Sequence, residues 1–227
     1  MNPSFLPFQK VFSFNELTQT PLQSTNALCW ERYLHGNFEE IVQILNDGSA
    51  IVEVDLYELS RINLSTEGKI AREVLKNDFK LLEKLGAQPA LNIVNRYPKD
   101  TDAEFISTDV YSFHVDRSPV LIDTYLCTYH GTSSDILPTA FAKKCVEVEE
   151  IRAELRKLFE GDEKDFELFL TENFFDLHYI PLPEAPIYSL GLHNLWRLAV
   201  DHPDQKVPAC IHRAPLENDI PRLMMIC

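Results

Sequence analysis

Short strand-like segments, rich in β-branched and aromatic residues, recur through the second half of this 227-residue chain. They do not alternate regularly with helices, as strands do in proteins built from repeated strand–helix–strand units with a parallel sheet. The sequence therefore predicts an α+β protein with an antiparallel sheet at its core and helices on the outside. The strands predicted for this half are residues 110–115, 120–128, 187–190, 194–200, 207–213 and 222–226.

Capping residues and apolar spacing predict the helices. Asn37 can cap a helix over 38–45, and Ser65 can cap a helix over 65–85, which Gly86 ends. Apolar residues at helical spacing mark the face of the longer helix that is expected to pack inward. These residues are Ile70, Val74, Leu75, Phe79, Leu82 and Leu85. The other predicted elements are strands over 50–56 and 90–97 and charged helices over 146–159 and 164–174.

The balance of charge and the cysteine count limit the possible partners and location. The chain has 21 basic and 35 acidic side chains, a formal charge of −14, so it should repel a phosphate backbone and nucleic acid is not an expected partner. It contains no apolar run of about 18 residues and no basic patch followed by an apolar stretch at its start, so neither a membrane span nor a secretory signal is predicted. Its five cysteines, an odd number without a CxxC pair, favour reduced thiols and a cytoplasmic location.

Phe113-His114-Val115-Asp116 is the first of two segments with candidate chemistry. Residues i and i+2 of a strand point to the same face, so His114 and Asp116 direct an imidazole and a carboxylate toward one point. Two histidines and one carboxylate form the facial triad of non-haem Fe(II) sites, which leaves positions open for oxygen and a co-substrate. A His-x-Asp pair alone is common by chance, and a half-buried histidine bonded to a neighbour is the alternative interpretation.

The second segment spans residues 211–226. His212 lies in a predicted strand and can supply the third metal ligand. The turn-rich stretch 214–221 then leads into the last strand, which begins at Arg222 and returns the chain toward His212. A buried arginine beside a metal site needs an anionic partner, and a dicarboxylate co-substrate held by the two-pronged guanidinium would be one.

His114-x-Asp116, His212 and Arg222, ten positions after His212, together resemble the Fe(II)/2-oxoglutarate-dependent dioxygenases. The resemblance implies a double-stranded β-helix, a jelly-roll or cupin-like barrel, in which His114, Asp116 and His212 bind iron. It also implies that Arg222 binds the far carboxylate of 2-oxoglutarate. The expected reaction is hydroxylation or demethylation of a small molecule or a peptide. Asp116 argues against halogenation, because related halogenases lack this carboxylate.

Asn95-Arg96-Tyr97 lies 17 residues before His114, counted from Tyr97. It is similar to the Asn-x-Tyr strand that contacts 2-oxoglutarate in the nucleic-acid-demethylating branch of the same superfamily. Asn95 and Tyr97 would share one strand face and bind the co-substrate, whereas a turn asparagine and a core tyrosine are the alternative.

The whole chain also resembles a bacterial domain family of unknown function. The segments that carry this resemblance are 26–30, 112–116, 126–131, 195–197 and 210–215. Together, the two resemblances predict a single domain over 1–227. Its parts are an N-terminal support (1–88), barrel strands (89–130 and 186–227) and a helical insert (140–180).

Other residues and other functions stay open. His178, which forms its own i, i+2 pair with Asp176, is the main rival for a metal ligand. Arg117 and Arg213 flank the proposed ligands and are interpreted as structural ion-pair residues, with contact to an acidic substrate as the alternative. Trp196 is expected in the core. A cupin-like metal enzyme that does not use 2-oxoglutarate and a non-enzymatic interaction module are the competing functions.

Overall fold

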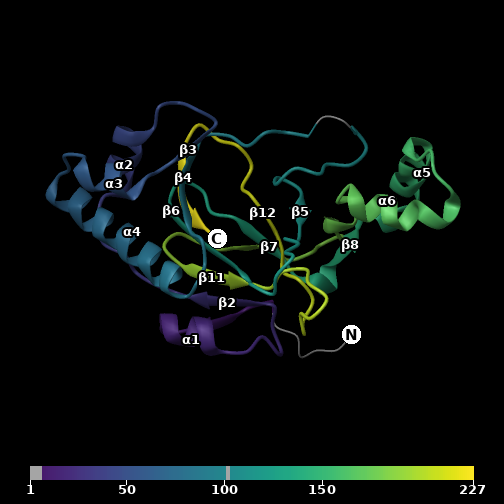
Figure 1. Ribbon diagram of the computed structural model, residues 1–227, viewed down its shortest axis with the longest axis horizontal. Coiled ribbons are helices and arrows are strands. Elements are labelled where there is room, and N and C mark those ends of the chain that lie inside the picture. Colours follow the sequence, from purple (N-terminus) through teal and green to yellow (C-terminus); the bar gives the residue numbers. More distant parts are fainter. Residues whose placement is uncertain (1–6, 101–102) are drawn as a thin grey trace.

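A computed structural model describes residues 7–100 and 103–227. Residues 1–6, the start of the segment predicted to lack a secretory signal, lie outside the described residues. The described residues form an α+β fold with two β-sheets, one of them a curled half-barrel, and six α-helices (Figure 1). Within these ranges, no helix combines the length and the apolar character needed to cross a membrane.

Two mostly antiparallel sheets form the centre of the molecule, as predicted. The larger sheet has the order β1-β2-β11-β6-β13-β4-β3, and only β1 and β2 pair in parallel. The smaller sheet has the order β10-β7-β12-β5-β9-β8 and is antiparallel throughout. The larger sheet contains β1 (Gln9–Val11), β2 (Ala27–Trp30), β3 (Ile51–Glu53), β4 (Ala90–Val94), β6 (Thr124–His130), β11 (Leu195–Leu198) and β13 (Arg222–Ile226). The smaller sheet contains β5 (Phe113–His114), β7 (Asp135–Leu137), β8 (Ala142–Lys144), β9 (His178–Pro181), β10 (Tyr188–Ser189) and β12 (Ile211–Arg213).

The chain crosses repeatedly between the two sheets from β4 onward. β4, β13, β6 and β11 lie next to one another in the larger sheet, and β5, β12, β7 and β10 lie next to one another in the smaller one. In chain order, β4, β5, β6 and β7 therefore alternate between sheets, and so do β10, β11, β12 and β13. This alternation brings β5 beside β12 although almost 100 residues separate them in the sequence.

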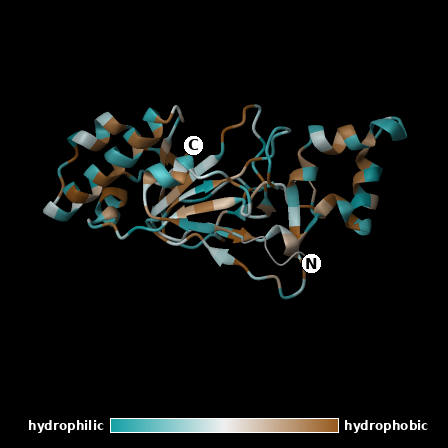
Figure 2. Ribbon diagram, turned by 90° about the horizontal axis from the view of Figure 1, so that it is seen from below, coloured by the Kyte–Doolittle hydropathy of each residue, from teal (hydrophilic) through white to brown (hydrophobic). Residues whose placement is uncertain are grey.

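The helices form two groups at opposite ends of the molecule (Figures 1 and 2). One group packs on the outer face of the larger sheet, where α2 contacts β6 and β13 and α4 contacts α2 and α3. The other group follows β8 and precedes β9 in the sequence, and it has a small core of its own around Leu155, Phe166 and Leu170. The helices are α1 (Phe14–Gln19), α2 (Phe38–Leu45), α3 (Leu56–Arg61), α4 (Thr66–Lys84), α5 (Glu149–Leu158) and α6 (Phe166–Glu172).

Alternate residues of β6 face opposite sides of the larger sheet, as strand geometry requires. Tyr125, Cys127 and Tyr129 belong to the core beneath the helices, whereas Leu126 belongs to a second cluster between the two sheets. Trp196 is also part of this second cluster and is 2% exposed, which confirms its predicted place in the core. The interior between the sheets is the side on which the candidate functional residues lie.

The two capped helices are confirmed. Asn37 accepts a hydrogen bond from the backbone N–H of Glu40, and Ser65 accepts one from that of Gly68, at the starts of α2 and α4. The inward face of α4 differs from the predicted stripe. Ile70 is 39% exposed, whereas Asp78 is buried. Asp78 turns inward because a buried arginine pairs with it, and this contact with a distant residue rotates the buried face.

Several predicted strands are shorter than the sequence indicates. Residues 120–122 lie outside β6 because the chain turns there, with the N–H of Ile122 donating to the carbonyl of Val120 at 2.8 Å. Residues 110–112 likewise precede the two-residue β5. Asp55 accepts hydrogen bonds from the N–H groups of Tyr57 and Glu58 and begins the helix α3, which the prediction of a strand over 50–56 missed. The N-terminal region also contributes β1, β2 and β3 to the larger sheet, and β7, β8 and β9 were not predicted.

Candidate metal centre

Two imidazoles meet where β5 and β12 pair. His114 and His212 are directly opposite in the antiparallel register, so their side chains leave the sheet on the same face. Their ring centroids are 4.7 Å apart. Phe113 and Ile211, one position earlier on each strand, point to the other face and pack in a separate apolar cluster. The alternation of apolar and imidazole side chains thus directs both rings between the two sheets.

Asp116 joins the two histidines from just beyond the end of β5. Its Oδ1 lies 3.9 Å from Nε2 of His114, and its Oδ2 lies 3.7 Å from Nε2 of His212. One ligand atom from each of the three residues lies within 4.8 Å of the others. The structure therefore brings together the three residues that the sequence predicts as a facial triad.

Hydrogen bonds fix the orientation of all three side chains. Nδ1 of His114 is 2.8 Å from the carbonyl of Ser112, and Nδ1 of His212 is 3.2 Å from the carbonyl of Cys210. A carbonyl can only accept, so each Nδ1 carries the proton and each Nε2 keeps its lone pair for a metal. Thr124 donates its hydroxyl hydrogen to Oδ2 of Asp116 at 2.6 Å. Such supports fix the orientation of metal ligands.

The electrostatics of the cluster favour the protonation states that bind a metal. Burial, together with the neighbouring imidazole of His212, lowers the pKa of His114 to about 4. Burial alone would raise the pKa of Asp116, but His212, the Thr124 hydroxyl and His114 outweigh this effect and lower it. A neutral imidazole and an ionised carboxylate are therefore present at neutral pH, as metal coordination requires.

The donor set fits a divalent transition metal. Ligand atoms at about 2.1 Å from one ion lie about 3 Å apart when they are at right angles. The observed spacings of 3.7 and 3.9 Å are slightly wider, so a small inward shift of the side chains would close the set around an ion. Two imidazoles and one carboxylate leave several coordination positions for other ligands. His114, Asp116 and His212 could thus hold a metal.

The triad lines a cavity of about 170 Å³ between the sheets, and Arg222 on β13 also lines it. Arg222 is 4% exposed. Its guanidinium donates to the hydroxyls of Thr128, at 3.0 and 3.3 Å, and Ser134, at 2.8 Å. Among the described residues, no carboxylate forms a salt bridge with Arg222, and burial lowers the pKa of its guanidinium. A buried cation held only by neutral groups is costly, so this arginine is suited to an anionic ligand.

Of the two residues predicted to contact the co-substrate, Tyr97 lines the cavity of the triad and Asn95 does not. Burial raises the pKa of the Tyr97 hydroxyl, which keeps it protonated as a donor. Asn95 lines the smaller adjoining pocket, which also contains Arg222, but not this cavity; its amide donates to Asn46 and to the carbonyl of Ser49. β4 ends at Val94, so the strand rule that would put 95 and 97 on one face no longer applies.

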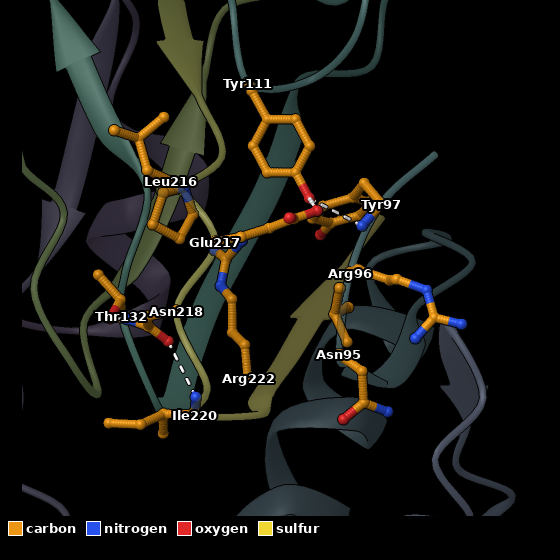
Figure 3. A pocket seen from close by; sticks show the side chains of 12 residues that line it. Asn95, Arg96, Tyr97, Tyr111, Thr132, Leu216, Glu217, Asn218, Ile220 and Arg222 are labelled. Carbon is orange, nitrogen blue, oxygen red and sulfur yellow. Dashed lines mark hydrogen bonds between the residues drawn. The ribbon is translucent and has the colours of Figure 1, made fainter. Parts of the chain in front are cut away.

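A second, smaller pocket adjoins the cavity and shares Arg222 and Tyr97 with it (Figure 3). Tyr111 reaches across this pocket. Its hydroxyl accepts from the N–H of Tyr97 at 2.9 Å and donates to Glu217 at 2.6 Å. Glu217 also pairs with Lys99 at 3.2 Å. These contacts fasten the segment before β13 over the arginine end of the cavity.

His178, the alternative metal ligand, and the two arginines that flank the ligands each have partners outside the triad. His178 lies across from His114 on β9, but it is outside the converging triad and its Nδ1 is 2.6 Å from the Ser112 hydroxyl. Arg117 and Arg213 form ion pairs, as the structural interpretation predicts. The pairs are Arg117 with Asp176 and Asp201, at 2.6 and 2.7 Å, and Arg213 with Asp135, at 3.0 Å.

Several residues of the site were not predicted from the sequence. Asn92 lines the cavity from β4, while Thr124 and Ser134 hold Asp116 and Arg222. Thr124 and Thr128, which contacts Arg222, are both even-numbered residues of β6, and alternate residues of a strand share one face. This alternation is the sequence signal that could have placed both on the inner face.

No protein-family model, curated protein or solved structure matches this chain.

Proposed function

We propose that this protein is an Fe(II)- and 2-oxoglutarate-dependent oxygenase that acts on a small molecule or a peptide. The observation that carries the proposal is the pairing, in one 170 Å³ cavity, of a His114–Asp116–His212 cluster with a buried arginine that has no acidic partner in the part of the chain that the structure describes. A metal site alone would fit many enzymes. A metal site beside an unpaired buried guanidinium fits a co-substrate that chelates a metal at one end and carries a carboxylate at the other.

The strand order supports a double-stranded β-helix as the framework of this enzyme. Eight strands in two sheets with back-and-forth connections are the arrangement of a jelly roll, a class that includes the cupins. Here the eight strands would be β4, β13, β6 and β11 in one sheet and β5, β12, β7 and β10 in the other. The triad would then lie on the smaller sheet and Arg222 on the larger one, facing each other across the barrel.

The bound metal would activate oxygen, with 2-oxoglutarate and oxygen consumed to give succinate, carbon dioxide and a substrate that gains one oxygen atom. His114 and His212 would each offer Nε2, because Nδ1 is committed to a backbone carbonyl. Asp116 would bind mainly through Oδ1, because Thr124 already donates to Oδ2. The chain's own contribution to this step is orientation and a neutral-to-anionic ligand set.

At the other end of the cavity, Arg222 would bind the far carboxylate of 2-oxoglutarate. Thr128 and Ser134 hold the guanidinium in place before any ligand arrives. Tyr97 would add a neutral hydroxyl donor to the same carboxylate. Charge-assisted, bidentate hydrogen bonds of this kind are strong and directional, and they would fix the opposite end of the co-substrate at the metal.

Anaerobic calorimetry with Fe(II) and then 2-oxoglutarate tests the proposal. Wild-type protein should bind one Fe(II), and His114→Ala and His212→Ala should each lose it while retaining the fold. Arg222→Met should keep Fe(II) but bind 2-oxoglutarate about 100-fold more weakly, as expected for the loss of a buried charged partner. Arg213→Met is the matched control, because Arg213 is paired with Asp135 and should leave both affinities unchanged.

The two competing functions correspond to different outcomes of the same titration. Stoichiometric metal binding without any affinity for 2-oxoglutarate would replace the proposal with a cupin-like metal enzyme. Absence of metal binding in well-folded wild-type protein would leave a non-enzymatic module. The decisive measurement is thus the titration of the wild-type protein with 2-oxoglutarate at saturating metal.

A further inference from the structure

The candidate centre is closed on one side and open on the other. The side chains of His114 and His212 are 13% and 8% exposed, whereas that of Asp116 is 34% exposed. Asp116 lines the cavity that contains Arg222 and also lines a separate hollow of about 380 Å³. A metal at this centre would therefore stand at the wall between two compartments, with the hollow on its carboxylate side.

Apolar side chains form the rim of this hollow. Val120, Leu121 and Ile122 follow one another in the sequence and are 53%, 51% and 51% exposed. Val120 and Ile122 line the hollow together with Val200, whereas Leu121 lines only the adjoining depression beside Tyr125, which Ile122 also borders. Contiguous exposed apolar groups at a cavity mark ligand-binding surfaces. The turn at 120–122 keeps these side chains out of the core and at the edge of the hollow.

The charged side chains that line the hollow are already satisfied within the chain. Arg117 and Asp123 each have partners, and Asp116 is a candidate metal ligand. No charged side chain among the described residues of the lining is left for an ionic ligand. The contacts are Arg117 to Asp176 at 2.6 Å and to Asp201 at 2.7 Å, and Asp123 to Arg197 at 2.6 Å and to Gln205 at 2.9 Å.

We propose that the 380 Å³ hollow binds the substrate that is oxidised, and that this substrate is an uncharged small molecule with a hydrocarbon group packed on Val120 and Ile122. The proposal rests on the proposed function, because Asp116 places the hollow beside the metal only if the triad binds one. A volume of this size is ordinary for a small-molecule site. Besides its apolar side chains, the lining has the neutral polar groups of Gln88, Ser118 and Thr124, which suit an uncharged polar group on the same ligand. A charged group placed here would lose its hydration without gaining a partner. The anionic co-substrate and the neutral substrate would thus occupy opposite sides of the metal.

Three probes with the same six-carbon chain test the proposal: 1-hexanol, hexanoate and hexylammonium. The protein is loaded with Mn(II) and 2-oxoglutarate without oxygen, and the proton relaxation of each probe is measured, since paramagnetic Mn(II) accelerates the relaxation of protons that bind nearby. We expect accelerated relaxation for 1-hexanol and at least tenfold weaker binding of both charged probes. Val120→Ser should weaken binding of 1-hexanol about five- to tenfold, because it removes apolar contact area.

Leu121→Ser is the matched control, since Leu121 is equally exposed but does not line the hollow. Ile122→Ser should reproduce the effect of Val120→Ser, and thermal unfolding checks that all three variants fold. Equal binding of the three probes, or equal loss in the Val120 and Leu121 variants, would overturn the assignment. Failure of the proposed function looks different, because the wild-type protein would then not enhance water relaxation above the value for free Mn(II), whatever the probes do.

Discussion

Two buried arginine side chains of this molecule have opposite surroundings. The side chain of Arg32 is 7% exposed and donates to both carboxylate oxygens of Asp78, at 2.7 and 2.8 Å, and Tyr129 donates to the same carboxylate at 2.7 Å. Arg222 is as deeply buried but has neutral partners among the described residues, the hydroxyls of Thr128 and Ser134. Burial alone would lower both pKa values, yet Asp78 reverses the direction and raises that of Arg32, whereas the pKa of Arg222 stays lowered.

The difference separates a structural ion pair from a binding group. Arg32 and Asp78 satisfy each other and fasten α4 to the larger sheet, so their chemistry is complete inside the chain. The charge of Arg222 is not matched by an acidic side chain among residues 7–100 and 103–227, in a protein that carries an excess of 14 negative charges. We infer that the missing partner is supplied from outside, and four predictions follow from that contrast, in order of decreasing effect.

The largest effect is expected when the structural pair is broken. Asp78→Ala would leave the Arg32 guanidinium buried without a partner and should lower the free energy of unfolding by about 3–5 kcal/mol. Arg222→Met is the comparison, because it removes an unmatched charge and should leave the stability of the metal-free protein unchanged or higher. Urea unfolding of both variants measures the difference. If Arg222→Met is as destabilising as Asp78→Ala, the contrast between the two arginines fails.

A smaller effect on stability is expected when 2-oxoglutarate binds and pairs with Arg222. In protein loaded with Mn(II) and kept free of oxygen, 2-oxoglutarate at 100 times its Kd should raise the free energy of unfolding by about 2.7 kcal/mol. Thermal unfolding with increasing 2-oxoglutarate measures this stabilisation. Arg222→Met should lose most of it, whereas Arg213→Met should retain it in full.

Thr124 tests the same principle at the other end of the cavity, where a hydroxyl holds an anion and not a cation. Thr124→Val keeps the shape but removes the donor to Asp116, and it should weaken Mn(II) binding about 10- to 100-fold. Thr124→Ser keeps the hydroxyl and should restore most of the affinity. Calorimetric titration gives both values, and equal affinities in the valine and serine variants would mean that the hydrogen bond does not position the ligand.

The pH dependence of the metal-free protein should show the smallest effect. The pKa of His114 is about 4 in the folded protein and 6.5 in the unfolded chain, so the unfolded chain binds more protons between these values. Stability from this residue is therefore present above pH 6.5 and is lost as the pH falls toward 4. Between pH 7 and pH 5.5, the free energy of unfolding should fall by about 1 kcal/mol from this residue. His114→Gln should remove that part of the slope, as followed by urea unfolding at each pH.

The sequence predicts the local part of the candidate site well. His114 and Asp116 share a short segment, so the spacing alone places them together. The ligand set also needs His212 directly opposite His114, and this register depends on where β12 meets β5, which no local pattern encodes. The prediction that His212 joins His114 therefore came from the resemblance to a known iron-binding triad.

Residues outside the motif could not be predicted because their roles depend on distant partners. Asp78 interrupts an apolar helix face, and only its contact with Arg32, 46 positions away, explains why it is buried. Asn95 was expected to share a strand face with Tyr97, whereas β4 ends three residues before Tyr97 and the Asn95 side chain turns to Asn46. Short strands of this kind carry too few residues for their ends to be read from composition.

Strand β6 separates the two arginines, and this has a consequence for how the protein can change. Neighbouring residues of this strand contact different arginine sites. Thr128 accepts a hydrogen bond from Arg222 in the cavity, and Tyr129 donates one to the Asp78 carboxylate beneath the helices. Substitutions at even positions can retune ligand recognition while leaving the scaffold intact. Inserting or deleting a single residue early in β6 would exchange the two sets of side chains, so both recognition and folding would fail at once.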